Sequence, residues 1–403
     1  RQVAWARDAH VEDVDQTLLA AKRKAKQERS EHKARQRRRN KEREVGEIKT
    51  ILEKVPQPAG MGALSLFRNL DECEAFTQID GGAAALASGA LDPETFAIDW
   101  SQVPVECDPG AEVWYGSKNL EHKSRRRERK RDQVQSFALI LAKLLGTLSR
   151  SNGAPSSPKQ ESGVRVVDFG SGTGALTLPL AFLFPEVHFH AVDMKPRSVE
   201  LLLEKAAKAG LANLTASAEM IEEFDQAFDI GLALHACGNA TDYAMLQSIK
   251  NRAAFAMCPC CVGKLKFSIE GGSSFSNKHK RFIGLGPAAA KDSAQAASPD
   301  GSGGEETLEH PRSQWLRSHV TSDQFALIAK AGDISHGCDD GASDGQFHGY
   351  EEIARTCKAN IEYDRAQAAA EKKYTTGLYR LINGKKTGKA EIILGIPDHL
   401  AAP

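Results

Sequence analysis

The chain has no long apolar run, no net charge and no regular cysteine spacing. None of its 403 residues lies in a stretch of the roughly 18 apolar residues that a transmembrane helix needs. Lysine plus arginine balance aspartate plus glutamate at 53 each, so no overall field draws the protein to nucleic acid or to a membrane. The eight cysteines do not form the spaced disulfide framework of a small secreted fold. We therefore expect a reducing compartment, the cytoplasm, with the nucleus as the alternative.

The length and the composition indicate one large domain with appendages. Hydrophobic residues make up 41% of the chain, enough for a packed core. We expect a basic helical arm over residues 1–55, an irregular accessory region over 56–115 and the main domain over 116–403. Residues 284–309 are rich in Gly, Ala, Ser and Pro, which is typical of a disordered insertion. Because the chain begins with Arg1, we expect a fragment or a processed form.

The sequence contains two basic clusters although its overall charge is balanced. The first spans residues 22–43, in a stretch of helix formers with no proline before Pro56, and the second spans residues 123–131. Both are expected on helices, and only the second helix continues into an apolar face. Such clusters favour RNA or a ribonucleoprotein as a partner, although no aromatic residues interleave with the basic ones. The alternatives are a charged arm without a specific partner and a nuclear address.

Strand and helix patterns alternate from residue 164 onward. The pattern predicts strands at 164–169, 187–192, 214–216, 230–234 and 253–257, and helices at 176–184 and 198–209. An Ala-rich helix at 350–373 and two hairpin strands, at 376–382 and 390–394, follow. This order predicts an α/β fold with a mostly parallel seven-stranded sheet, helices on both faces and one antiparallel strand.

Three glycines follow the first expected strand. Gly170, Gly172 and Gly174 enclose Ser171 where the strand gives way to a helix. Glycine lets the backbone adopt positive φ and approach a ligand, and a helix N-terminus adds unpaired N–H groups. The loop is therefore suited to a phosphate or to the amino-acid part of S-adenosylmethionine. Alone it also fits a dinucleotide, because Ala175 completes a Gly-x-Gly-x-x-Ala pattern.

Carboxylates follow or end the first three expected strands. Asp168 precedes the glycines, where it can hold an ammonium group but would repel a pyrophosphate. Asp193 ends the second strand, where a carboxylate can accept hydrogen bonds from both ribose hydroxyls, and Met194 follows it. Glu219 follows the third strand, where an adenine pocket is expected. For each carboxylate the alternative is a capping or turn residue.

One histidine and four cysteines follow the fourth and fifth expected strands. His235 is a candidate general base or a positioning residue, since its unperturbed pKa is about 6.5. Cys237 comes from the same segment, and residues 258–261 read Cys-Pro-Cys-Cys. The spacing is not that of a zinc knuckle, so we expect no metal and small polarizable side chains that line a narrow apolar pocket.

Together these segments resemble a known family. The resemblance is carried by residues 168–174, 234–242 and 258–261, with support from residues 131–133, 311–313, 362–365 and 374–378. The chain resembles class I S-adenosylmethionine-dependent methyltransferases, in the family that includes the glutathione S-transferase C-terminal domain-containing protein. More distantly it is similar to the tRNA acceptor-stem 2′-O-methyltransferases, which have histidines where residues 258–261 are Cys-Pro-Cys-Cys. The resemblance covers roughly residues 115–396, and residues 1–115 show no glutathione-transferase-like pattern.

The resemblance implies a fold, a cofactor and a reaction. It implies a Rossmann-like class I domain that binds S-adenosyl-L-methionine through Asp168, Gly170, Gly172, Gly174 and Asp193. The reaction would be methylation of an acceptor that the sequence does not identify, with RNA as the candidate that the basic clusters favour. Two alternatives stay open: an inactive methyltransferase-like adaptor, and an NAD(P)-dependent oxidoreductase, against which Asp168 argues.

Overall fold

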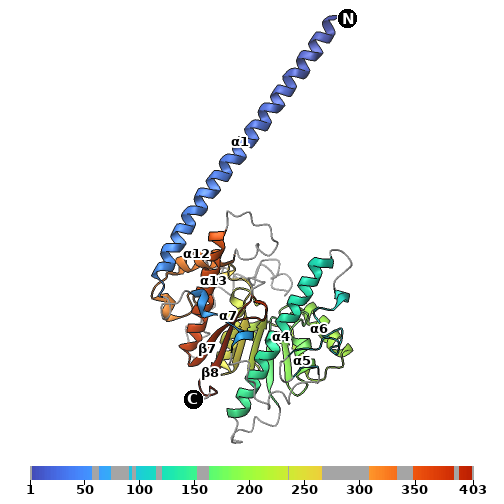
Figure 1. Ribbon diagram of the computed structural model, residues 1–403, viewed down its shortest axis with the longest axis vertical. Coiled ribbons are helices and arrows are strands. Elements are labelled where there is room, and N and C mark those ends of the chain that lie inside the picture. Colours follow the sequence, from blue (N-terminus) through green and yellow to red (C-terminus); the bar gives the residue numbers. More distant parts are fainter. Residues whose placement is uncertain are drawn as a thin grey trace, which may run out of the picture. The chain divides into compact units, whose positions relative to one another are not determined.

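The computed structural model describes residues 2–56, 63–73, 90–92, 97–114, 120–151, 163–234, 236–265, 308–333, 348–384 and 390–401. The chain divides into two units, Arg1–Lys54 and Val55–Pro403. The first unit is one basic helix, α1 (Gln2–Lys54), drawn blue in Figure 1. Its side chains from residue 23 to residue 40 are exposed, and the Arg38–Glu42 pair, 3.0 Å apart, lies along its surface. Such i,i+4 pairs support a helix that has no buried face between residues 23 and 40.

The second unit is built on one eight-stranded sheet, in the order β1-β7-β8-β6-β5-β2-β3-β4. Every neighbouring pair is parallel except those that β8 makes with β6 and β7. The direction of strand addition reverses between β2 and β5, and ligands of doubly wound sheets bind at the carboxyl ends of strands beside such a reversal. The strands are β1 (Arg68–Asn69), β2 (Arg165–Phe169), β3 (His188–Val192), β4 (Leu214–Ser217), β5 (Ile230–Leu234), β6 (Ala254–Cys258), β7 (Tyr374–Arg380) and β8 (Glu391–Pro397).

Helices cover both faces of the sheet (Figure 1). Along β2, Val166 packs with α4, α5 and α6, whereas its neighbour Val167 packs with α7 and α13. This alternation follows from the two-residue repeat of a strand and places one apolar core on each face. The helices are α4 (Leu120–Ser151), α5 (Thr177–Leu183), α6 (Pro196–Lys208), α7 (Asn239–Lys250), α11 (Gln314–Arg317), α12 (Ser322–Gly332) and α13 (His348–Ala370), with 3-10 turns at Ala63–Leu66, Leu70–Glu72, Glu112–Trp114 and Ile221–Glu223.

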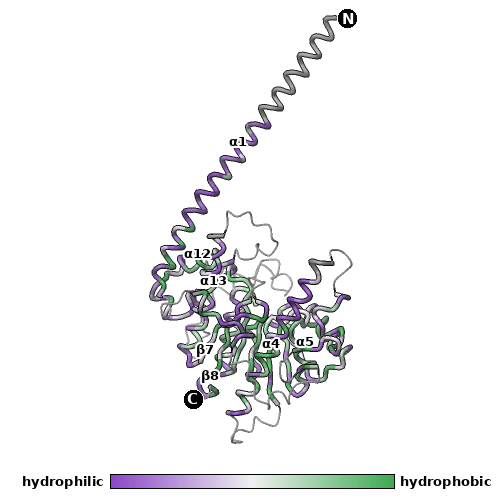
Figure 2. Tube along the Cα trace, viewed as in Figure 1, coloured by the Kyte–Doolittle hydropathy of each residue, from purple (hydrophilic) through white to green (hydrophobic). Residues whose placement is uncertain are grey.

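Hydropathy follows this arrangement (Figure 2). The sheet and α5 are mainly hydrophobic, and α4 changes from hydrophilic to hydrophobic along its length. The change in α4 matches its burial, since Arg125 and Arg126 are exposed and Phe137 and Ile140 are fully buried. No helix in the described part of the chain is both long and apolar enough to cross a membrane.

The predicted α/β class and mostly parallel sheet are confirmed, and two details differ. The sheet has eight strands rather than seven, because the two-residue strand β1 pairs with β7. The accessory region is irregular where it is described, but it is not separate from the sheet domain. Leu91, Ile98 and Cys107 are buried in the same core as Phe137 of α4. The insertion expected at 284–309 lies outside the described residues, except for its last two positions.

Candidate functional site

The glycine loop (residues 170–174) joins β2 to the segment that leads into α5. The backbone N–H groups of Gly170 and Ser171 both donate to the carbonyl of Val192, at 2.8 and 3.0 Å, so the loop is anchored to the end of β3. The Ser171 hydroxyl is buried and has no hydrogen-bond partner among the residues that the structure describes. A buried hydroxyl without a partner is costly, so this oxygen is a candidate contact for a bound ligand.

The glycines of this loop serve two purposes. Gly170 and Gly172 have φ of +75° and +57°, and a Cβ at either would meet no atom within 4 Å. These positions therefore border open space that a ligand can enter. Gly174 has φ +84°, and a Cβ there would lie 2.7 Å from Leu178 and 3.0 Å from Leu202. Its role is close packing of the loop on two helices.

Asp168 is almost fully buried at the end of β2. One of its carboxylate oxygens accepts a hydrogen bond of 2.5 Å from the Thr177 hydroxyl. Burial raises the pKa of Asp168 to about 7, the Thr177 hydrogen bond opposes the rise, and the charge of Asp193 adds to it. A cation beside Asp168 would therefore be stabilised strongly, because it would relieve the cost of the buried charge. Sequence reasoning missed Thr177, which is an ordinary helix-start residue in the pattern.

Asp193, Met194 and Glu219 lie at the carboxyl ends of the next two strands. The carboxylate of Asp193 accepts from the N–H groups of Gly172 (3.0 Å) and Lys195 (2.9 Å), which fixes it against the glycine loop. Met194 and Glu219 are half-buried after β3 and β4. The sequence pattern assigned Asp193 and Glu219 to the ribose and adenine of one ligand, and the strand order brings the ends of β2, β3 and β4 side by side.

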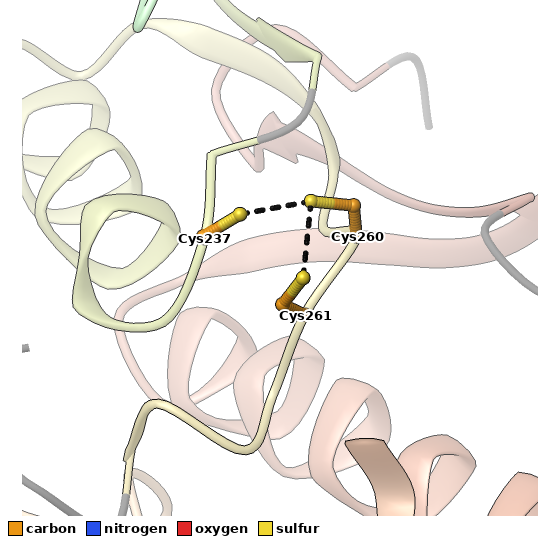
Figure 3. Close-up of side chains that lie close together, drawn as sticks. All are labelled: Cys237, Cys260 and Cys261. Carbon is orange, nitrogen blue, oxygen red and sulfur yellow. Dashed lines mark hydrogen bonds between the residues drawn. The ribbon is translucent and has the colours of Figure 1, made fainter. Parts of the chain in front are cut away.

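Three cysteines from two loops form a thiol cluster (Cys237, Cys260 and Cys261; Figure 3). Cys237 follows β5 and the other two follow β6, so the cluster lies at the carboxyl ends of neighbouring strands. The contacts with Cys237 and Cys261, together with burial, raise the pKa of Cys260. Cys258 is not part of the cluster, and burial raises its pKa to about 12. The predicted catalytic residue His235 lies outside the described residues.

A buried ionic network holds the loop between β5 and α7. Arg365 of α13 is 1% exposed and donates to both carboxylate oxygens of Asp242, at 3.0 and 2.6 Å. It also donates to the carbonyl of Gly238 at 3.0 Å. Burial favours the neutral acid, but Arg365, His310 and Arg312 outweigh it and hold the pKa of Asp242 below its usual value. Asp242 is therefore a charged, paired carboxylate.

The same network joins three of the segments on which the family resemblance rests. Asp364 accepts from the backbone N–H groups of Arg312 (2.8 Å) and Ser313 (2.9 Å) and from the Ser313 hydroxyl (2.5 Å). Burial raises the pKa of Asp364 to about 6 and that of Glu362 to about 7. The loop between β5 and α7 is therefore supported by residues 240–242, 311–313 and 362–365. The sequence showed these segments but no role for them.

The basic cluster of α4 is divided between internal contacts and the surface. Arg131 pairs with the buried Asp108 at 2.5 Å, and Arg127 pairs with Glu112 at 2.8 Å. These arginines hold the segment before α4 against the helix. Arg125 and Arg126 are exposed. A part of the cluster predicted to contact a partner is therefore used within the fold.

Residues 129–267 match a protein family described as a methyltransferase domain. The chain is 30% identical over 169 residues to the glutathione S-transferase C-terminal domain-containing protein of Homo sapiens. The aligned region covers 42% of this chain and 23% of that protein. It is 43% identical over 67 residues to the ribosomal RNA small subunit methyltransferase G of Bacteroides thetaiotaomicron, covering 17% of this chain and 32% of that protein. The chain thus spans about a quarter of the length of the first relative and a third of the second.

Among solved structures, the chain is similar to magnesium protoporphyrin IX methyltransferase from Synechocystis PCC 6803 with bound SAH. The two are 12% identical, with a TM-score of 0.32, over 72% of this chain and 92% of that chain. Because this TM-score is low, the fold assignment rests on the strand order and register of the sheet itself.

Proposed function

We propose that this chain, which carries a domain of the methyltransferase family, binds S-adenosylmethionine and transfers its methyl group to an acceptor. One observation carries the proposal. The buried Ser171 hydroxyl and the open glycines Gly170 and Gly172 belong to a loop that follows Asp168 and donates a hydrogen bond to Asp193. An adenosyl amino acid has an ammonium group and a ribose diol, and the two carboxylates match them.

The residues present fit this cofactor. Asp168 would hold the ammonium group, because a cation offsets the burial that raises the pKa of this carboxyl. Asp193 would accept hydrogen bonds from the ribose hydroxyls, and Ser171 would gain the partner that it lacks. Met194 and Glu219 would lie beside the adenine. When bound, S-adenosylmethionine supplies an electrophilic methyl group on a sulfonium.

The chain contributes orientation and electrostatics to this reaction. Methyl transfer is an in-line displacement, so the protein must align the acceptor atom with the methyl group and exclude water. The loops after β5 and β6 would align the acceptor and exclude water, since the ligands of such sheets lie at the carboxyl ends of the strands. The Asp242–Arg365 pair keeps the β5 loop in place through Gly238. His235, next to this loop in the sequence, stays a candidate general base.

Gly172→Ala is expected to reduce mainly ligand binding, and Gly174→Ala is expected to reduce mainly the stability of the fold. Gly172→Ala should cost only about 1 kcal/mol of stability, from its positive φ, but should weaken S-adenosylhomocysteine binding by more than about tenfold. Gly174→Ala should destabilise the fold by about 2–4 kcal/mol, because its Cβ collides with Leu178 and Leu202. Urea unfolding and calorimetric titration measure the two effects. Unchanged binding by Gly172→Ala would show that the loop does not contact the ligand.

RNA is the acceptor that we propose. It is supported by the exposed Arg125 and Arg126 on α4 and by the exposed basic residues of α1 between positions 23 and 39, since phosphate contacts dominate RNA affinity. Methyl transfer from tritium-labelled S-adenosylmethionine to total RNA tests the proposal, with nuclease-treated RNA and cellular protein as parallel acceptors. We expect label in RNA, and at least a several-fold lower rate for the double variant Arg125→Gln/Arg126→Gln. The matched control is Lys250→Gln, which removes a positive charge from the end of α7.

Other outcomes distinguish the remaining functions. Label in protein but not in RNA would overturn the choice of acceptor and leave the methyltransferase activity standing. Cofactor binding without transfer to either acceptor would favour the adaptor alternative.

A further inference from the structure

We propose that the thiol cluster (Cys237, Cys260 and Cys261) binds a metal ion of the d10 class that thiolates prefer, and that this ion is Zn²⁺. Nothing in the methyl-transfer reaction requires this site, so the inference does not depend on the proposed function. It rests on the positions of three sulfur atoms and on how the two loops that carry them are held.

The sulfur atoms have nearly the spacing that zinc requires. All three lie within 4.8 Å of one another, with 3.6 Å between Cys260 and Cys261 and 2.9 Å between Cys237 and Cys260. Tetrahedral zinc with Zn–S bonds of about 2.3 Å holds its sulfur ligands about 3.8 Å apart. The Cys237–Cys260 distance must therefore open for the ion to bind, and the Cys237 side chain is half-buried.

The two loops are fixed before any metal binds. The N–H group of Gly238 donates to the carbonyl of Cys261 at 3.0 Å, which links the loop after β5 to the loop after β6. The Thr241 hydroxyl donates to the carbonyl of Ala236 at 2.6 Å, and Arg365 donates to the carbonyl of Gly238. Each ligand residue therefore lies beside a residue that is held by a hydrogen bond. Preorganised ligands lower the entropic cost of metal binding.

The chemistry of the donors selects the metal class. Among the residues that the structure describes, the cluster contains three thiols and no carboxylate, and thiolates prefer zinc or Cu(I) to magnesium or calcium. Cys260 is buried, whereas Cys237 and Cys261 are half-buried, so the cluster can be reached from one side. A tetrahedral zinc ion takes four ligands, so the three thiols of the described residues supply three of the four positions. Each thiol that binds gives up its proton to solvent, so loading releases up to three protons per ion.

The test uses the full chain under a non-thiol reductant, loaded with Zn²⁺ or Co²⁺ and freed of excess metal. We expect one zinc per chain by elemental analysis, and a thiolate-to-cobalt charge-transfer band with the visible bands of a tetrahedral site. Cys237→Ser and Cys261→Ser should weaken metal binding by at least about 100-fold. Cys357→Ser, a fully buried thiol on α13 outside the cluster, is the matched control and should retain the metal.

Several outcomes would overturn the proposal. One is substoichiometric zinc in the wild type, and another is a metal content of Cys237→Ser equal to that of the wild type. A third is a Cys237–Cys260 disulfide that forms in air, together with no metal binding under reducing conditions. If the serine variants fail to fold, alkylation of the wild type decides the question. Zinc should slow modification of Cys237 and Cys261 by at least about tenfold, and equal rates with and without zinc would contradict the site.

Discussion

Asp168→Asn is expected to lose S-adenosylhomocysteine binding by on the order of 100-fold and yet to be more stable than the wild type above neutral pH. The binding loss follows because the amide cannot neutralise the ammonium group of the ligand. The stability gain follows because Asn is neutral at every pH, whereas the buried carboxyl of Asp168 must ionise at high pH. A residue that destabilises the empty fold and binds the ligand is typical of a functional site.

The sign of the pH dependence follows from the raised pKa of Asp168. The pKa of Asp168 is about 7 in the folded protein, above the ordinary value of 3.8 for an aspartate, so the folded state holds the proton more tightly than the unfolded state. The contribution of this group to stability is therefore full at low pH and is lost as the pH rises through the folded pKa. Between about pH 5 and about pH 8, the wild type should lose about 3 kcal/mol relative to Asp168→Asn.

Urea unfolding over this pH range and calorimetric titration check both effects. The exposed Asp225→Asn removes the same charge at the surface and should change neither stability nor binding appreciably. Binding to the wild type should also weaken below neutral pH, by up to about tenfold per pH unit, because the ligand then competes with a proton on Asp168. A variant that binds normally, or a stability difference that does not grow with pH, would refute the role given to Asp168.

Asp242→Asn is expected to destabilise the sheet domain by about 3–5 kcal/mol. The substitution leaves Arg365 buried at 1% exposure with its bidentate partner gone. The surface pair of Arg197 and Glu200 on α6 is the matched control, since both side chains are more than half exposed. Glu200→Gln should therefore change stability by less than about 0.5 kcal/mol.

Equilibrium unfolding of the two variants near pH 8 measures this difference. Because the folded pKa of Asp242 lies below its usual value, its contribution is present above the unfolded pKa and is lost as the pH falls through the folded one. The gap between Asp242→Asn and the wild type should therefore narrow in acid. A loss below about 1 kcal/mol at pH 8 would mean that solvent reaches Arg365 and that the network does not support the loop.

The sheet and the glycine loop could be predicted because their signals are local. The strand β2 brings Val166, Val167 and Phe169 together just before three glycines, and the pattern placed its start within one residue of Arg165. The strand β1 could not be predicted, because two residues carry no periodicity. The burial of Leu91 and Cys107 could not be predicted either, since irregular segments have no apolar repeat that tells which residues face the core.

The parts of the site that were missed depend on contacts between distant segments. Asp242 and Arg365 are 123 residues apart in the chain, so their pairing follows from the packing of α7 and α13 and not from any local pattern. The sequence pattern already grouped Cys237 with the cysteines of residues 258–261 at the ends of two expected strands, and the order of β5 and β6 brings these segments together. The pattern could not show which of the four thiols lie close to one another, because that depends on the paths of the two loops.

The most direct test of the cofactor assignment is calorimetric titration of the full chain with S-adenosylhomocysteine, beside Asp193→Ala and an NADH titration. We predict binding to the wild type on the order of micromolar, its loss in Asp193→Ala, and no heat from NADH. No binding of S-adenosylhomocysteine to a folded wild type would contradict the proposal. Binding of NADH in its place would make the glycine loop between Asp168 and Asp193 in the sequence a dinucleotide site.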